Sequence, residues 1–269
     1  MLLLVNQDNL SYGSNPANLK SMEGNPNYKF VKGDVSDFDL VSQLIKSVDV
    51  VVNFAAQTHV DRSIANPESF LQSNTLGTST LLEAARRNNP NMRIVNIGTD
   101  EVYGDIASGS FTEKDRLQPS SPYAASKAAS DMLLLAYHRT YKLKIILTRC
   151  TNNFGSFQFP EKLMPKTIVR ANLDLKVPVY GKGTNIRDWI YVRDFCTAIE
   201  TIIDKGDVGE IYNISAKNEI QNIDLVKRIL SLMGKTDLIE FVEDRPGHDL
   251  RYSLDSTKLR KELGWKPQF

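Results

Sequence analysis

The chain has 269 residues, of which 41% are apolar and 24% charged, as in ordinary globular proteins, so it can bury one large core or two coupled ones. Its 33 Lys and Arg balance 32 Asp and Glu to a net charge of +1, and no basic run occurs, which argues against a nucleic-acid partner. The apolar opening, residues 1–5, is too short for a signal peptide or a membrane span, so no membrane partner is expected.

The cysteines and histidines do not follow a metal-binding pattern. Cys150 and Cys196 are isolated in the sequence, and His59, His138 and His248 are scattered. We therefore expect no metal site and no disulfide framework, and a reducing cytoplasmic location is the default.

Short runs rich in Val and Ile alternate along the chain with helical patterns. Strands are predicted at residues 2–6, 29–32, 48–54, 93–97, 144–148 and 210–214. Helices are predicted at residues 37–47, 67–87, 122–141 and 194–204. Asp34 and Ser36 stand where helix N-caps belong, and Pro90 follows the end of the second helix. The strand runs are almost entirely apolar, which indicates burial on both faces and predicts an α/β fold, a Rossmann-like doubly wound parallel sheet with ligands at the carboxyl ends of its strands.

The alternation stops after Asn153. The following segment, up to residue 191, is rich in Gly and Pro and is expected to consist mostly of loops. Beyond residue 216 the pattern predicts a helix at 223–233, a strand at 238–242 and a short helix at 256–263. We expect a Rossmann-like domain, residues 1–153 with about 190–215, and a smaller C-terminal substrate-binding lobe, about 154–189 with 216–269.

Tyr123 and Lys127 are four residues apart in a predicted helix, so their side chains are neighbours on one face. An ammonium close to a phenol favours phenolate, which predicts that the pKa of Tyr123 lies below its ordinary value of about 10. Such a phenol could accept a proton from an alcohol that is being oxidised. Taken alone, the pair is more often a pair of surface neighbours.

The segment "IGTDEVYGD" places Asp100 and Glu101 side by side after a buried strand. Neighbouring side chains of a regular strand point to opposite faces, so both acids can reach one site only if the strand has already ended. From the spacing alone, capping of the following turn is the favoured interpretation.

Several long motifs occur in an order that resembles one enzyme family. They are "AAQTHVDRS", "GTDEVYGD", "PSSPYAASKAASD", "NNFGSFQFPEKLMP", "YGKGTNIRDWIYVRD" and "DRPGHDLRY". Together they are similar to dTDP-glucose 4,6-dehydratase, a member of the extended short-chain dehydrogenase/reductase superfamily, from about residue 5 to the last residue. The resemblance implies the cofactor NAD, a nucleotide-diphosphate-sugar substrate and a homodimer.

The resemblance also implies a reaction in which both acids act. Tyr123, helped by Thr99 and Lys127, would take the proton of the sugar C4 hydroxyl while hydride passes to NAD+. Glu101 would remove the C5 proton as a base, and protonated Asp100 would donate to the C6 hydroxyl as it leaves as water. The hydride would then return to C6, which gives the 4-keto-6-deoxy sugar.

Further residues are assigned by matching the family's motifs position by position. Contacts with NAD are implied for Asp8, Asp34, Val35, Ala55, Ala56, Ser73, Tyr123, Lys127 and Asn153. Substrate contacts are implied for Thr58, Asn152, Lys162, Leu163, Tyr180, Arg187, Asn222, Arg245 and His248. An acid in the position of Asp8 favours NAD over NADP, because it would repel a 2′-phosphate. Considered singly, each arginine is more often a surface residue, His59 a polar surface residue, and Trp189 a core residue.

The match departs from the family at the amino end. The family starts with a strand and a Gly-x-x-Gly-x-x-Gly turn that approaches the cofactor pyrophosphate, whereas residues 1–6 match its second strand. We therefore expect the Gly-rich segment and the central strand of the sheet to be missing, and the carboxyl end to stop before a further helix of the relatives.

Three alternatives remain open at this point. The enzyme could be a related dehydratase or epimerase that acts on a UDP- or GDP-sugar. The chain could also be a truncated homologue without catalysis that acts only within an oligomer. Finally, the helices predicted at 67–87 and 122–141 could form a dimer face or pack within a monomer core.

Overall fold

The centre of the fold is a parallel sheet. The computed structural model describes residues 3–269, so Leu2, the first residue of the strand predicted at 2–6, lies outside the described residues. Within them, strands pair in the order β3 (Val50–Asn53), β4 (Arg93–Thr99), β5 (Lys144–Cys150) and β9 (Ile211–Ile214), all parallel. The last four predicted strands are therefore confirmed, and the structure shows that they lie next to one another.

Strands β4 and β5 form a ladder of seven residue pairs that ends at the pair Thr99–Cys150. Gly98 lies next to this end, and a Cβ atom there would stand 2.3 Å from the carbonyl oxygen of Thr148. Only glycine permits this close approach of the two strands. The register brings the carboxyl ends of β4 and β5 together at one edge of the sheet.

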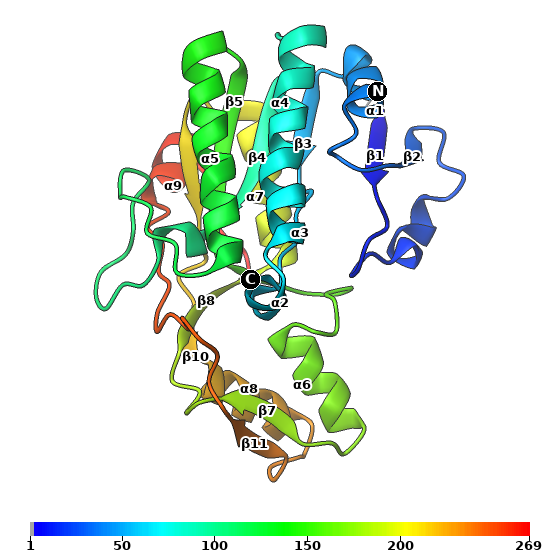
Figure 1. The fold of residues 1–269 in the computed structure, drawn as a ribbon. Coiled ribbons are helices and arrows are strands. Elements are labelled where there is room, and N and C mark those ends of the chain that lie inside the picture. Colours follow the sequence, from blue (N-terminus) through cyan, green and yellow to red (C-terminus); the bar gives the residue numbers. More distant parts are fainter. Residues whose placement is uncertain (1–2) are drawn as a thin grey trace.

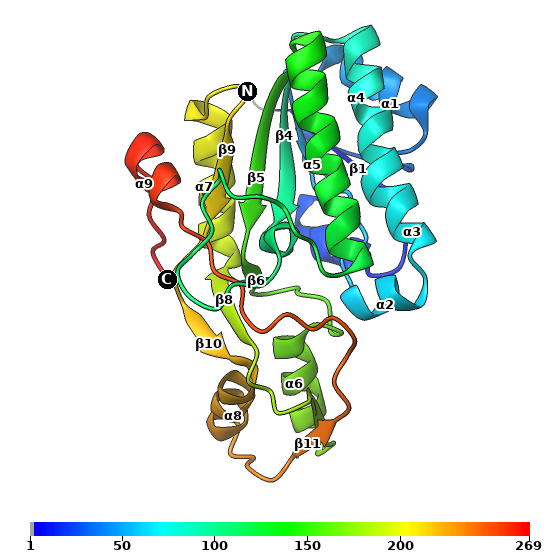
Figure 2. The ribbon, with the colours of Figure 1, turned by 60° about the vertical axis from the view of Figure 1, so that its left-hand side comes forward.

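Helices cover both faces of the sheet. α1 (Phe38–Leu44), α4 (Gly77–Asn88) and α5 (Pro122–Tyr141) lie on one face, and α7 (Val192–Lys205) and α9 (Thr257–Leu263) lie on the other (Figures 1 and 2). This arrangement confirms the doubly wound α/β fold. The short 3-10 turn η2 (Ile45–Ser47) follows α1 and completes the helix predicted at 37–47.

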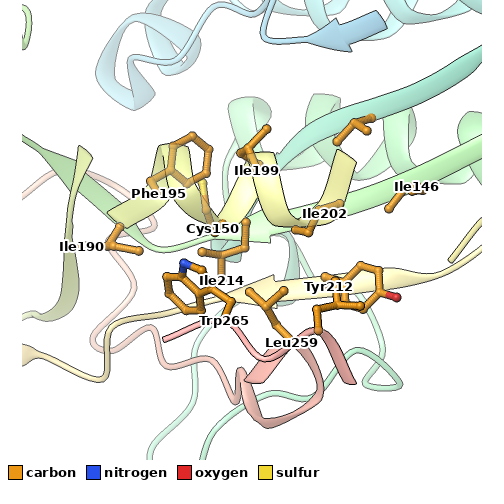
Figure 3. Packing of buried hydrophobic residues seen from close by; sticks show 13 residues of the cluster. Ile146, Cys150, Ile190, Phe195, Ile199, Ile202, Tyr212, Ile214, Leu259 and Trp265 are labelled. Carbon is orange, nitrogen blue, oxygen red and sulfur yellow. The ribbon is translucent and has the colours of Figure 1, made fainter. Parts of the chain in front are cut away.

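Figure 3 shows how the sheet packs on the α7 and α9 side. Ile146 and Ile214 from the strands contact a cluster that includes Ile199 and Ile202 of α7 and Leu259 of α9, and each of these five side chains is buried. Full burial of such a side chain stabilises the fold by about 1.5–3 kcal/mol. The sheet is therefore a rigid support for the side chains at its edge.

The bounds of α5 match the prediction because strong local signals set them. Ser121 is the N-cap, its hydroxyl oxygen accepting a hydrogen bond from the Ala124 amide at 3.1 Å, and Pro122 occupies the first helical position. Lys142 ends the helix in the left-handed region with φ of 60°. At α1 the prediction was wrong by a few residues, since Asp37 caps the helix in place of Asp34 or Ser36.

The single helix predicted at 67–87 is interrupted. α3 (Glu68–Phe70) leads into a π-helical turn, η3 (Leu71–Leu76), before α4 begins at Gly77. The side chain of Asn74 in this turn accepts from the Gln57 amide at 2.8 Å and donates to the Ser126 hydroxyl at 2.8 Å. These long-range hydrogen bonds offset the cost of the irregular turn, and no local pattern predicts them.

The prediction of a loop-rich segment up to residue 191 was wrong. It contains β6 (Asn152–Phe154), α6 (Leu163–Asn172), β7 (Val177–Tyr180) and β8 (Ile186–Tyr191). Pro165 lies in the first turn of α6, where a missing N–H costs no helical hydrogen bond. The short helix α2 (Val60–Ala65) was also not predicted.

A smaller layered unit, which we call the small lobe, lies below the carboxyl ends of the sheet strands in Figure 1. It contains β7, α6, α8 (Asn222–Leu232) and β11 (Ile239–Val242), packed around a core that includes Ala171, Val177 and Val226. β10 (Glu219–Gln221) pairs with β8, which in turn pairs with β6, so a mixed three-stranded sheet connects the two parts.

β1 (Leu4–Asp8) and β2 (Tyr28–Lys32) form a separate parallel pair with the 3-10 segment η1 (Pro16–Met22) between them. Among the described residues, no strand pairing joins β1 to β3. Within the same part of the chain, the structure has no helix of the length and apolarity needed to cross a membrane, and no acid, His and Cys cluster arranged for a metal ion.

Candidate active site

Several residues assigned to NAD, and Thr99 of the assigned catalytic set, lie where the parallel strands end. Asp8 ends β1, Asp34 follows β2, Ala55 follows β3, Thr99 ends β4 and Asn153 follows β5. In open parallel sheets this edge is where ligands bind, because the connecting loops diverge there and leave a crevice.

The two acids at the β1–β2 end are fixed by local hydrogen bonds. Asp8 accepts from the Leu10 amide at 2.6 Å and from the Ser14 hydroxyl at 2.8 Å. Burial raises the pKa of Asp34, but hydrogen bonds from Ser36 and Asn9 outweigh this and bring the pKa below its ordinary value. Both carboxylates are therefore held in defined positions at the ends of β1 and β2.

Other assigned positions suit close approach of a flat ligand. Ala55 and Ala56 add only a methyl group each after β3, and Val35 packs so tightly on Gly77 that a Cβ there would stand 2.5 Å from Val35 Cγ1. Ser73 lies in the π-helical turn η3, and such turns are frequent at functional sites. Asn153 has a buried Oδ1 with no hydrogen-bond partner among the described residues, so it is free to accept from a ligand.

The strand β4 ends at Thr99, and the acid pair lies in the 3-10 turn η4 (Asp100–Tyr103). The Thr99 hydroxyl donates to Asp100 Oδ1 at 3.2 Å, and its oxygen accepts from the Glu101 amide at 3.3 Å. The alternation of a strand therefore no longer applies, and both acids belong to one turn. The capping role that spacing alone favours falls to Thr99, whose side chain accepts the hydrogen bond at this turn.

The two acids lie in a medium that favours their neutral forms. Burial, followed by the charge of Glu101, raises the pKa of Asp100 well above its ordinary value. Burial also raises the pKa of Glu101, but the positive charges of Arg245, Arg187 and Lys162 oppose that rise. Asp100 Oδ2 and Glu101 Oε2 are buried without partners among the described residues, so each acid keeps one oxygen for a ligand.

Tyr123 and Lys127 lie on one face of α5, as predicted, and only about 6% of each is exposed. The prediction of a lowered pKa for Tyr123 was wrong for this structure. Burial, and then the charge of Glu101, raise the pKa of Tyr123 well above its ordinary value, although a hydrogen bond with Thr99 lowers it. Lys127 cannot reverse this, because its ammonium donates to the Ile97 carbonyl at 2.6 Å and burial lowers its own pKa.

The amino end of α5 is tied to α2. Ser63 is completely buried, its hydroxyl donates to the Val60 carbonyl at 2.7 Å, and its oxygen accepts from the Tyr123 amide at 3.1 Å. The ring of Phe70 meets the Tyr123 ring edge to face at 6.3 Å between centroids. These contacts set the position of the phenol through the backbone and the ring.

A cavity between the sheet edge and the small lobe collects the residues assigned to the substrate. All nine line it together with Glu101: Thr58, Asn152, Lys162, Leu163, Tyr180, Arg187, Asn222, Arg245 and His248. They come from loops and elements as far apart as the end of β3 and the segment after β11. The structure thus brings together every position that the motif resemblance assigned to substrate binding.

Cationic side chains dominate one wall of the cavity. Arg187 is 5% exposed and donates to the carbonyl oxygens of Ile186 and Asp249, with its guanidinium 4.1 Å from the centre of the Tyr252 ring. Lys162 donates to the carbonyl and the hydroxyl oxygen of Thr58 at 3.0 and 3.3 Å. Because none of these partners is a carboxylate, their positive charge remains available for an anionic ligand.

Several lining residues were missed by the sequence reasoning. They are His59, Asp61, Glu161, Lys166, Trp189 and Tyr252. His59 is not a simple surface residue, since its Nε2 lies 3.6 Å from Glu161 and its Nδ1 is buried. Asp61 lies in the quoted motif "AAQTHVDRS", and Tyr252 ends the motif "DRPGHDLRY", so the signal was present but no role was attached to either residue.

The fold and this set of side chains define a Rossmann-like protein of the extended short-chain dehydrogenase/reductase class. Residues 1–269 match the family model described as GDP-mannose 4,6 dehydratase. The chain is 48% identical over 262 residues to dTDP-glucose 4,6-dehydratase from Streptomyces niveus, covering 97% of this chain and 78% of that protein. It is also 48% identical over 267 residues to the low-salt glycan biosynthesis protein Agl12 from Haloferax volcanii, with 99% and 86% covered.

Comparison with a solved structure also shows similarity to a dTDP-glucose 4,6-dehydratase. The dTDP-glucose 4,6-dehydratase DesIV from Streptomyces venezuelae, solved with NAD and dTDP bound, superposes with a TM-score of 0.98 at 44% identity, and the match covers 99% of this chain and 83% of that one. The chain therefore belongs to the nucleotide-sugar 4,6-dehydratase family, and the resemblance to dTDP-glucose 4,6-dehydratase is confirmed.

Proposed function

We propose that this chain dehydrates dTDP-glucose to the 4-keto-6-deoxy sugar with NAD as its cofactor. The observation that supports this most strongly is the geometry around Glu101, which lines the same cavity as the nine candidate substrate residues. The turn that carries Glu101 also carries Asp100, next to Thr99 and the phenol of Tyr123. Elimination of water requires a pair of acids at this point, whereas simple oxidation of an alcohol does not.

The residues at the strand ends fit NAD. Asp8 and Asp34 would hold the adenosine ribose and the adenine end with Val35, while Ala55 and Ala56 would leave room for the backbone to approach. Ser73 and the free Oδ1 of Asn153 would complete the contacts. When bound, NAD+ supplies the hydride acceptor and later the hydride donor, and it adds a positive charge to the site.

The first step is oxidation at C4. Tyr123 receives the proton of the C4 hydroxyl, and the Thr99 hydroxyl holds the same oxygen. Because burial and the charge of Glu101 raise the pKa of the phenol, nearby positive charge is needed to produce the phenolate. Lys127, anchored on the Ile97 carbonyl, contributes part of that charge.

The second step is loss of water across C5 and C6. A ketone at C4 acidifies the C5 proton, which Glu101 accepts, and Asp100 donates a proton to the C6 hydroxyl. This division needs one charged and one neutral acid. The environments support it, since three nearby cationic side chains favour the charged form of Glu101, whereas Glu101 itself favours the neutral form of Asp100.

The diphosphate of the substrate would bind Arg187 and Arg245. A guanidinium can hold phosphate oxygens through two parallel hydrogen bonds, which fixes the orientation of the group. Lys162 and His248 lie in the same cavity, Lys162 as a further source of positive charge and His248 as a further hydrogen-bonding group. The sugar would then point towards Glu101 and Tyr123.

Mass spectrometry of the product tests the function directly. The purified protein, supplied with NAD and dTDP-glucose, should release a nucleotide sugar that is lighter by one water. In heavy water the product should contain one deuterium at C5, because Glu101 exchanges its proton with solvent before returning it. Absence of water loss with dTDP-glucose would refute the proposal.

The same assay separates the alternatives. UDP- and GDP-glucose supplied in parallel reveal a dehydratase with another nucleotide preference. An epimerase would change the stereochemistry at C4 without any change of mass. A truncated homologue without catalysis would give no product and would retain no NAD after purification.

We further propose that the protein forms a homodimer in a reducing cytoplasm. Leu76 in η3 and Met132 on α5 are about half exposed, and α4 and α5 lie side by side on the outside of the sheet (Figure 1). Burying such apolar side chains against a second copy would be favourable. Sedimentation of the wild type and of Met132→Glu tests this, since the variant should sediment as a monomer. The free thiols of Cys150 and Cys196 fit a reducing compartment.

A further inference from the structure

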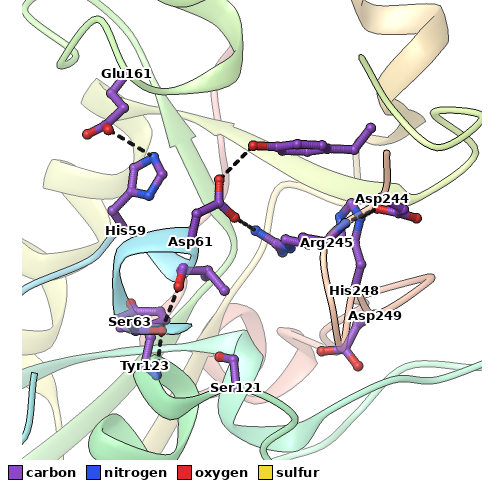
Figure 4. A network of polar contacts seen from close by, with 12 residues as sticks. His59, Asp61, Ser63, Ser121, Tyr123, Glu161, Asp244, Arg245, His248 and Asp249 are labelled. Carbon is purple, nitrogen blue, oxygen red and sulfur yellow. Dashed lines mark hydrogen bonds and ion pairs between the residues drawn. The ribbon is translucent and has the colours of Figure 1, made fainter. Parts of the chain in front are cut away.

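Asp61, which lines the cavity, joins the two parts of the molecule (Figure 4). It lies on α2, next to the sheet, and its carboxylate contacts two residues of the small lobe. Its Oδ2 accepts from the Tyr180 hydroxyl at 2.8 Å, and its Oδ1 lies 3.4 Å from Nη1 of Arg245. Tyr180 and Arg245 are 119 and 184 residues away in the sequence.

The contact with Arg245 uses only one of its nitrogens. The Nε atom of Arg245 is buried and has no hydrogen-bond partner among the described residues, and the whole side chain is 18% exposed. A guanidinium presents five N–H groups in a fixed plane, and Nε together with the adjacent Nη forms one edge suited to two phosphate oxygens. Asp61 therefore holds Arg245 from one side and leaves a two-nitrogen edge free.

The contact with Tyr180 extends the same arrangement. The Tyr180 ring meets the His248 ring edge to face at 6.2 Å between centroids, and His248 Nδ1 lies 2.6 Å from Asp244. One carboxylate thus supports three neighbouring residues of the cavity wall, two of them directly. In Figure 4, Asp61 points towards Arg245, and His248 and Asp244 lie on the far side of Arg245.

The helix that carries Asp61 also contacts the backbone of Tyr123, the residue with the catalytic phenol. Ser63, two residues further along α2, accepts the hydrogen bond of the Tyr123 amide at 3.1 Å. The same short helix therefore contacts both the small lobe, through Asp61, and the amino end of α5, through Ser63. A shift of the small lobe relative to the sheet would act on both.

We propose that Asp61 is a positioning residue that fixes Arg245 and Tyr180 of the small lobe for the diphosphate of the nucleotide sugar. This inference rests on the proposed function and adds to it a residue that does not itself contact the substrate. Asp61 orients the guanidinium so that its Nε edge faces the ligand, which reduces the rotational freedom that binding must remove. Replacing Asp61 weakens diphosphate binding although a negative charge is removed from an anion site.

The direction of the change in diphosphate binding distinguishes a positioning role of Asp61 from simple charge repulsion. The cavity is lined by four lysine and arginine side chains and three carboxylates, those of Asp61, Glu101 and Glu161. If Asp61 only repelled the diphosphate or competed for Arg245, its neutralisation would tighten binding. Glu161 offers a matched control, because it carries the same charge at the same cavity but contacts Arg62 and His59 in place of Arg245.

The experiment measures dTDP binding to the NAD-loaded protein by calorimetry. Asp61→Asn keeps an acceptor for Tyr180 and the size of the side chain, and it should raise the Kd for dTDP about tenfold, the loss of one charge-assisted contact. Glu161→Gln should not raise it. With dTDP-glucose, Asp61→Asn should raise KM by a similar factor with little change of kcat. In an Arg245→Ala background, Asp61→Asn should have no further effect on dTDP binding.

An unchanged or tighter Kd in Asp61→Asn would overturn the proposal, as would an equal loss in Glu161→Gln. Failure of the proposed function appears separately, as absence of turnover by the wild type. If the wild type also fails to bind dTDP, the contact between Asp61 and Arg245 can still be tested by measuring the unfolding of the ligand-free protein. The double-mutant cycle of Asp61→Asn and Arg245→Ala should show a coupling of about two- to fivefold in the unfolding equilibrium constant, and additivity would refute the contact.

Discussion

Two ion pairs with the same chemistry lie at opposite depths of this molecule. Behind the catalytic helix, Arg149 Nε bonds Asp131 at 2.8 Å, and the two side chains are 2% and 0% exposed. At the rim of the cavity, Arg62 Nε bonds Glu161 at 3.2 Å, and the side chains are 44% and 22% exposed. The two N–O distances differ by only a few tenths of an ångström. The difference in exposure to water therefore determines how much each ion pair contributes.

The deep pair is part of the catalytic surroundings. Asp131 follows Lys127 by one helical turn, and its charge raises the pKa of that lysine against the effect of burial. Arg149 also donates to the Tyr103 hydroxyl at 2.7 Å, so the guanidinium is held from two sides. The same low-dielectric interior raises the pKa of Asp100 and Glu101, whereas water screens the charges at the rim.

The largest effect is expected at Tyr123, which is buried, as the Arg149–Asp131 pair is. Tyr123→Phe should slow oxidation at C4 about 10³-fold, because no other group assigned here accepts the C4 proton. Single-turnover formation of the reduced nicotinamide measures this step. NAD content and thermal unfolding serve as controls for folding, and an unchanged rate of hydride transfer would count against the role of Tyr123.

Breaking the deep ion pair should come next. Asp131→Ala should lower the free energy of unfolding by about 3–5 kcal/mol, because it leaves the guanidinium of Arg149 buried without its carboxylate. Urea unfolding followed by circular dichroism gives the value. A loss of unfolding free energy below about 1 kcal/mol would mean that the deep ion pair contributes no more than a surface ion pair, which would contradict the expected effect of burial.

A smaller effect should separate the two acids of the turn. Glu101→Gln should allow C4 oxidation but slow water loss about 10²-fold, since no base removes the C5 proton. Incorporation of deuterium at C5 in heavy water should disappear in this variant. In Asp100→Asn, deuterium incorporation should persist while water loss is slow, and the opposite pattern would exchange the two roles.

The pH dependence follows from the direction of the same pKa shift. Glu101 must be ionised to act as a base, and burial raises its pKa above the ordinary value. Activity should therefore fall as the pH decreases through this raised pKa, at a higher pH than for an exposed glutamate. A profile of kcat against pH measures it, and loss of the acidic limb in Glu101→Gln would identify the group.

The smallest effect is expected at the rim. Glu161→Gln removes the carboxylate that Arg62 contacts, yet it should change the free energy of unfolding by less than about 1 kcal/mol, because water stabilises both partners when they separate. The urea experiment used for Asp131 provides the measurement. A loss of unfolding free energy comparable to that of Asp131→Ala would contradict the expected difference between the deep ion pair and the ion pair at the rim.

Prediction from the sequence succeeded where signals are local. The Val- and Ile-rich runs identified the strands, and Ser121 with Pro122 fixed the start of α5. It failed where structure depends on distant partners: β6 and β10 are three residues long and exist through pairing with β8, and the π-helical turn follows from the bonds of Asn74 with Gln57 and Ser126.

The candidate site shows the same division. Motif resemblance named nine substrate residues, and all nine line one cavity. It gave no role to Asp61, whose partners lie 119 and 184 residues away. The helical spacing of Tyr123 and Lys127, for its part, predicted the wrong direction for the pKa of Tyr123. Spacing along a helix reports which side chains are neighbours but not how much water surrounds them.

The sequence by itself determined the α/β class, the positions of the sheet strands after residue 47 and the identity of the reactive side chains. These depend on periodicity and on residue type, which the chain carries locally. Only the tertiary structure decided that the neutral form is favoured more strongly for Asp100 than for Glu101, how Arg245 is oriented, and which ion pair is buried away from water. Those properties arise from burial and from contacts between remote segments, because the energy of a charge depends on everything that packs around it.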